Sequence, residues 1–188
     1  MDNNEFIFDV TDLKLPIECL NQFASLIEQA TKSYVQGNVD SYSGSIYSEY
    51  DRSHNFSIDT SIFTNGRIIR DIQDALGAVS GKGIVKLEFY LSSKSLEDYK
   101  CRLMFVEYGL GGYPVTVVLE KNIASEIKDE TKVSSEYCIC NSMQQFQNLL
   151  NLVYETKYLH DLLQSIITEV LVREDRKKNK KISEDCID

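Results

Sequence analysis

The strongest constraint on the fold is a block of three strand patterns that lie close together between residues 85 and 120. Segments 85–91 and 101–106 alternate apolar and other side chains with the period of two that a half-buried strand requires. The connection SSKSLED between them is short and polar, so we expect these two strands to pair antiparallel. The third segment, VTVVLE at 115–120, is apolar on both faces and therefore predicts an interior strand.

The part of the chain before this block predicts a mixture of helices and strands. Apolar residues recur at spacings of three and four over 16–34, which indicates a helix that ends at Gly37 and Asn38. The same spacing, after Asn65 and Gly66, predicts a second helix over 67–79. The other predicted elements here are a strand at 6–10, a loop or irregular hairpin at 39–55 and a strand at 56–62.

The part after the block predicts mostly helix. Within the block, the glycines at 109–112 favour a turn between the second and third strands. After the block, the sequence predicts a short helix at 122–130 and a short strand at 137–140. Helical spacing returns over 142–172, where one long helix and two shorter ones are both compatible with the pattern. The expected fold is therefore α+β: a largely antiparallel sheet with helices packed on one face and a long C-terminal helical segment.

The chain reads as one domain over 1–172 followed by a charged tail over 173–188, because no linker rich in Pro, Gly or Ser divides it. It has 20 Lys plus Arg against 29 Asp plus Glu, a net charge of −9, and residues 1–172 alone hold 14 basic and 24 acidic side chains. Such a field repels nucleic acid and attracts cationic partners. The basic cluster of the tail is interspersed with acids, so nucleic-acid binding is not expected.

Catalytic signatures are missing from the sequence. It contains no GxxxxGK[ST], HExxH, GxSxG, paired CxxC or EF-hand loop. Cys138 and Cys140 are two apart, so on a strand they share a face, and with His160 they could form an unfamiliar enzyme site or three soft metal ligands. Ordinary core thiols and a core histidine explain the same residues, so we assign no catalytic residue, no metal site and no cofactor.

Segment 39–59 is the most suggestive candidate site. Its tyrosines provide large contact area at low entropic cost, its small polar residues let a loop adapt, and its carboxylates select a cationic partner. Tyrosines that pack onto the domain beneath an ordinary loop would give the same composition. The candidate partner-binding residues are Asp40, Tyr42, Tyr47, Glu49, Tyr50, Asp51 and Asp59.

These features favour a noncatalytic acidic protein that binds and masks a basic protein, as an immunity protein or antitoxin inhibits a nuclease toxin. The alternatives are an enzyme with a site near Cys138, Cys140 and His160, and an oligomeric adaptor or scaffold that self-associates through its C-terminal helix. The five cysteines are an odd, scattered set, which predicts reduced thiols. The N-terminus is acidic and the sequence has no membrane segment, so we expect a cytoplasmic protein.

Overall fold

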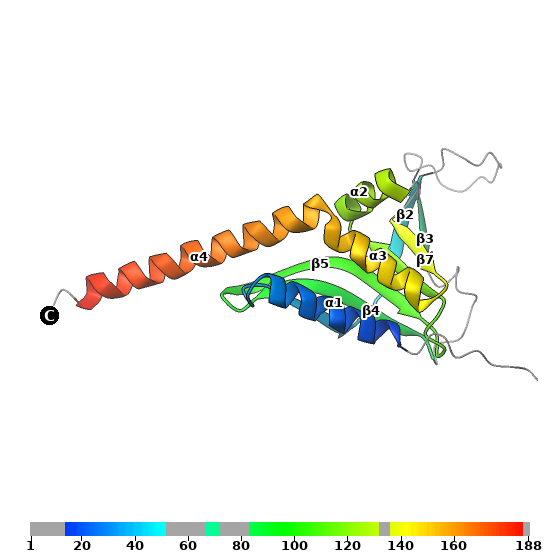
Figure 1. Ribbon diagram of the computed structural model, residues 1–188, viewed down its shortest axis with the longest axis horizontal. Coiled ribbons are helices and arrows are strands. Elements are labelled where there is room, and N and C mark those ends of the chain that lie inside the picture. The colour runs from blue at the N-terminus through cyan, green and yellow to red at the C-terminus, as the bar shows by residue number, and fades with distance from the viewer. Residues whose placement is uncertain (1–13, 52–66, 72–82, 132–135, 186–188) are drawn as a thin grey trace, which may run out of the picture.

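The computed structural model describes residues 14–51, 67–71, 83–131 and 136–185, and it confirms the α+β class. A five-stranded antiparallel sheet packs against four helices, and a separate two-stranded ribbon lies beside them (Figure 1). The elements in chain order are α1 (Pro16–Ala30), β1 (Gln36–Ser41), β2 (Tyr47–Asp51), β3 (Arg67–Asp71), β4 (Val85–Ser93), β5 (Leu96–Tyr108), β6 (Val115–Leu119), α2 (Lys121–Thr131), β7 (Tyr137–Cys140), α3 (Met143–Glu155) and α4 (Lys157–Asp185).

The large sheet has the order β1-β4-β5-β6-β7, and every neighbouring pair is antiparallel. The predicted hairpin of β4 and β5 is confirmed, as is the interior place of β6 between β5 and β7. β5 begins at Leu96, earlier than the pattern indicated, because its register against β4 shifts beyond Phe89 and interrupts the regular alternation. The predicted strand at 137–140 and the turn at 109–112 are also confirmed.

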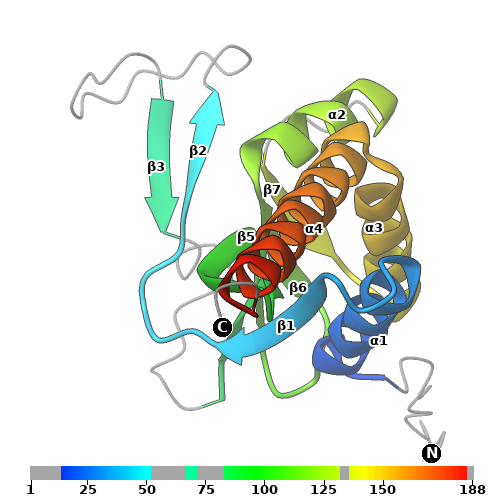
Figure 2. The same cartoon turned by 90° about the vertical axis from the view of Figure 1, so that its left-hand side faces the viewer.

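The two faces of this sheet have different chemistry. One face carries apolar side chains that form the main core with the four helices, including Leu87, Phe89 and Val117. Figure 2 shows the helices gathered on this side of the sheet, as predicted. The other face, which we call the open face, carries Asp40, Glu88 and other polar or aromatic residues, because alternate residues of a strand point to opposite sides.

The prediction that the first helix ends at Gly37 is wrong. α1 ends at Ala30, and Gly37 lies in edge strand β1, where a Cβ atom would come within 2.8 Å of the Ala24 Cα in α1. The turn between them is held by buried Thr31, whose hydroxyl donates to the Ile27 carbonyl at 2.8 Å and accepts from the Val35 amide at 3.3 Å. Gly37 therefore allows close packing of α1 on β1 rather than capping a helix.

Two further predictions in the N-terminal half are corrected. The loop or irregular hairpin predicted over 39–55 contains strand segments instead, since β1 reaches Ser41 and β2 covers Tyr47–Asp51, and in the described part of the chain these two strands pair with β4 and β3 and not with each other. The helix predicted over 67–79 is wrong at its start, where Arg67–Asp71 forms β3 and pairs antiparallel with β2. Apolar residues in a five-residue strand can match helical spacing, and strand pairing overrides that local preference. The predicted strands at 6–10 and 56–62, and the rest of the predicted helix from 72 on, lie outside the described residues.

The helical segment after residue 142 is two helices. Ser142 caps α3 by accepting from the Gln145 amide at 3.3 Å. The chain then adopts an extended conformation at Thr156, and α4 begins at Lys157. The Glu126 carboxylate of α2 accepts from the first α4 amides, those of Lys157 at 2.7 Å and Tyr158 at 2.9 Å.

Helix α4 continues to Asp185, so most of the charged tail that we separated from the domain is a helical extension. Its buried residues Leu159, Leu163, Ile166 and Val170 join the main core. No helix in the described ranges has the length and hydropathy needed to cross a lipid bilayer.

Candidate functional site

The structure divides the candidate partner-binding residues between two successive strands of the chain, β1 and β2, which belong to different sheets. Asp40 lies near the end of β1 and is exposed, and Tyr42 follows that strand directly. Tyr47, Glu49, Tyr50 and Asp51 belong to β2. Asp59 lies outside the described residues. The segment is thus largely strand, with exposed Ser43 and Ser45 in the connection.

Asp40 is anchored by a tyrosine of the neighbouring strand. The Tyr90 hydroxyl donates to the Asp40 Oδ2 at 2.7 Å across the sheet. This hydrogen bond to the carboxylate, with burial and the nearby negative charges, raises the pKa of Tyr90 to about 12. Tyr90 therefore stays a neutral donor, and Asp40 keeps a fixed orientation on the molecular surface.

Tyr42 is part of the packing of the open face. Its ring lies 4.6 Å from the Phe105 ring between centroids, and it contacts a small apolar cluster around buried Ile46 and Val118. The Arg102 guanidinium lies 4.4 Å from the Phe105 ring centre and 5.7 Å from that of Tyr42. Tyr42 is half-buried, so only part of its ring is available to a partner.

A charged cluster that we did not predict lies beside Asp40 on the open face. Glu88 is buried and accepts from Lys100 and, at 2.8 Å, from the Arg102 Nε. Burial alone would raise the pKa of Glu88, but the hydrogen bonds and charges of Lys100 and Arg102 outweigh it and lower that pKa. The Lys100 Nζ also lies 3.9 Å above the Tyr90 ring, which links this cluster to Asp40.

Glu88 and Glu107 are two carboxylates of the β4–β5 hairpin that lie close in the sheet. They share the open face, but Glu88 pairs in register with Phe105, and Glu107 pairs with Lys86. Glu107 is fully buried, and its Oε2 lies 4.0 Å from the Lys86 Nζ. The two carboxyl groups therefore sit in separate charge environments, and they do not form the facing pair that glycosidase chemistry uses.

The ribbon of β2 and β3 carries the remaining described candidates. In register, Tyr47 lies opposite Asp71, Glu49 opposite Ile69 and Asp51 opposite Arg67. Asp51 thus has a basic residue across from it, while Glu49 does not.

The alternative site combines the two strand thiols, Cys138 and Cys140, with His160. Cys138 and Cys140 share the core-facing side of β7, as predicted, and burial raises their pKa to about 11 and about 12. Both thiols are therefore protonated at neutral pH and are poor nucleophiles. Among the described residues, no group of three or more His, Cys, Asp and Glu side chains is arranged to hold a metal ion.

His160 is also placed differently from our expectation. We interpreted it as a core residue, but it is exposed on α4, and its ring makes an edge contact with Tyr154 at 5.8 Å between centroids. The apolar spacing suggested burial because His160 lies between residues 159 and 163, which are both buried. Position 160, however, lies about 100° around the helix from 159, which turns its side chain toward solvent.

Comparison of the chain with models of protein families, with curated proteins and with solved structures finds no match in any of the three.

Proposed function

We propose that this protein is a noncatalytic acidic binding protein whose surface around Asp40 and the β2–β3 ribbon binds a basic protein. The observation that carries the proposal is the placement of this ribbon. Within the described residues β2 pairs with β3 alone, and the ribbon stands apart from the five-stranded sheet (Figure 2). An isolated two-stranded ribbon is marginally stable in water, so a partner that packs against it would stabilise it.

The composition of this surface supports a cationic partner. The ribbon strand β2 has the sequence YSEYD, which combines two tyrosines with two carboxylates, and exposed Asp40 lies near it in the sequence. Lys100 and Arg102 on the open face are already engaged by Glu88, and Lys86 on the same face is paired with Glu107. The net charge of −9 adds a long-range attraction that raises the encounter rate with a basic protein.

The role we propose is inhibition by masking, of the kind that an immunity protein or antitoxin exerts on a nuclease toxin. Asp40 and the ribbon together have four carboxylates against two arginines in their sequence, and this negative excess would compete for the basic residues with which such an enzyme holds nucleic-acid phosphates. We place this activity in the cytoplasm, where the four described cysteines, all free, would stay reduced. Self-association through α4 stays a prediction, supported by exposed Leu171 and Val172.

The test is affinity capture from the native host, followed by kinetics with the purified partner. The double variant Asp40→Asn/Glu49→Gln should slow association several-fold and flatten its dependence on salt, because these charges act through a screened field. The matched control Glu155→Gln/Asp161→Asn removes two exposed carboxylates from α3 and α4. Equal effects of both variants, or a captured partner without net positive charge, would rule out the proposed surface.

A further inference from the structure

The inward-facing side of α4 changes character along its length. Leu159, Leu163, Ile166 and Val170 are buried at spacings of four, three and four. The same spacing continues with Arg173 and Lys177, so these cations occupy the side of the helix that is apolar one turn earlier. Figure 1 shows that this end of α4 extends beyond the sheet. The helix therefore presents positive charge where its apolar packing ends.

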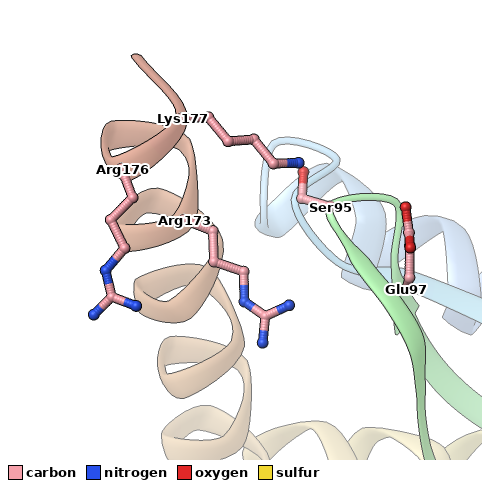
Figure 3. A pocket seen from close by; sticks show the side chains of 5 residues that line it. All are labelled: Ser95, Glu97, Arg173, Arg176 and Lys177. Atoms are coloured by element: carbon pink, nitrogen blue, oxygen red, sulfur yellow. The ribbon is translucent and has the colours of Figure 1, made fainter. Parts of the chain in front are cut away.

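This basic side faces the tip of the β4–β5 hairpin across a groove. The groove has a volume of about 440 Å³ and is lined by Ser95 and Glu97 from the hairpin and by Arg173, Arg176 and Lys177 from α4. In Figure 3, Arg173 and Lys177 extend from the helix toward the hairpin, whereas Arg176 points away from it. The groove thus has two cations directed inward, a hydroxyl on the opposite wall and a third cation at its rim.

The charges in this groove are only partly compensated within the described residues. The Arg173 Nε donates to the Glu169 Oε1 at 2.7 Å in an exposed pair, which leaves the guanidinium Nη groups available for a ligand. The Ser95 hydroxyl donates to the Glu174 Oε1 at 3.5 Å, which is long for a hydrogen bond between oxygens. A ligand oxygen that accepts at a shorter distance would therefore replace the Glu174 carboxylate as the acceptor.

We propose that this groove binds a small polyphosphate anion, such as inorganic tripolyphosphate or the phosphate chain of a phosphate ester. Arginine binds phosphate oxygens with two parallel hydrogen bonds, and lysine adds a point charge, so Arg173 and Lys177 form a suitable pair. The groove volume is typical of small-ligand sites. The acidic body opposes long nucleic acids, which must pass close to it, more than it opposes a small anion.

This inference is independent of the proposed partner surface, because the basic end of α4 and the β2–β3 ribbon lie at opposite ends of the long axis of the molecule (Figure 1). The test is titration of the full-length protein with tripolyphosphate by isothermal calorimetry. Arg173→Gln/Lys177→Gln should weaken binding about tenfold or more, since each removes charged hydrogen bonds to the ligand. Lys157→Gln/Lys178→Gln removes the same charge from exposed positions that do not line the groove, and it should change the affinity less than about twofold.

Glu97 provides a second test, in which substitution should raise the affinity for tripolyphosphate instead of lowering it. Its carboxylate lines the groove and repels an anion, so Glu97→Gln should tighten tripolyphosphate binding several-fold, while Glu155→Gln should not. Circular dichroism checks that each variant keeps its helix content. Three results would overturn the proposal. The wild-type protein could fail to bind tripolyphosphate, or the two double variants could weaken binding equally. The third result is that an oligonucleotide binds more tightly than tripolyphosphate and that its binding depends on Lys178.

Discussion

Glu88 shows how one residue of the open face combines burial with charge. Its carboxylate is buried, but both of its partners, Lys100 and Arg102, have side chains that are 42% exposed. Water therefore screens the cations, and the ion pairs contribute much less to stability than fully buried pairs would. The cluster does fix the orientations of Lys100 and Arg102 over the rings of Tyr90 and Phe105.

We predict that Glu88→Gln lowers the free energy of unfolding by about 1 to 2 kcal/mol at pH 7. Because the pKa of Glu88 is lowered on folding, its contribution is fully present above its ordinary pKa of 4.5 and is lost as pH falls through the folded value. The stability difference between wild type and variant should therefore shrink below about pH 4. Urea unfolding of wild type and variant at several pH values measures this, and a stability difference that stays constant with pH would contradict the prediction.

Another prediction concerns Gly37, whose backbone in β1 lies close to the backbone of Ala24 in α1. Gly37→Ala should destabilise the fold by about 1 to 3 kcal/mol, because the added Cβ would lie 2.8 Å from the Ala24 Cα and 3.0 Å from the Phe89 ring. Gly109→Ala is the control, since its added Cβ has no atom within 4 Å, and it should change stability by less than about 0.5 kcal/mol. Equal unfolding midpoints in urea for the two variants would contradict close packing of α1 on β1.

At the scale of elements, α4 has two parts with different physical roles. Its first part packs into the core through Leu159, Leu163, Ile166 and Val170. Most described residues beyond Val170 are exposed, and the helix there is held mainly by its own hydrogen bonds and by pairs such as Glu169 with Arg173. The core therefore depends on the first part alone.

A chain that ends at Val172 should consequently keep its fold, with a loss of stability of about 1 kcal/mol or less. It should lose tripolyphosphate binding, because Arg173, Arg176 and Lys177 are removed. The contrasting variant Leu163→Ala should cost about 2 to 5 kcal/mol, since it opens a cavity in the core. Thermal unfolding followed by circular dichroism compares the two, and a large loss in the truncated chain would show that the helix end supports the core.

At the scale of the whole molecule, the open face and the ribbon have different expected roles. Residues of the open face stabilise the fold, whereas residues of the ribbon are the candidates for binding a partner. Tyr42 packs on Phe105 and belongs to the first group. Tyr47 and Tyr50 lie in the ribbon, which pairs with no strand of the five-stranded sheet in the described part of the chain. The three tyrosines of segment 39–59 are therefore expected to respond differently to truncation.

With a captured partner, Tyr47→Ala or Tyr50→Ala should mainly accelerate dissociation, by an amount equivalent to about 1 to 2 kcal/mol if the ring is a buried anchor. Tyr42→Ala should instead lower the melting temperature, because it removes an aromatic contact of the folded chain. Surface plasmon resonance and thermal unfolding measure the two effects. Unchanged dissociation rates for both ribbon variants would remove these tyrosines from the partner surface.

The sequence by itself determined the elements whose patterns are local and repeated. The alternation in β4 and the continuous apolar run in β6 identify these two strands, because each pattern follows from whether a strand is buried on one face or on both. It also located the acidic, tyrosine-rich segment as the candidate partner surface. The net charge that limits the partner class likewise follows from composition alone.

Tertiary structure decided whatever depends on pairing between distant residues. Strand β1, with the sequence QGNVDS, has little strand character and exists because it pairs with β4, and β3 exists because it pairs with β2. The partners of Glu88, the exposure of His160 and the groove between α4 and the β4–β5 hairpin follow from the same long-range packing. A short window of sequence records the preferences of a segment, whereas these features depend on which other segment it meets.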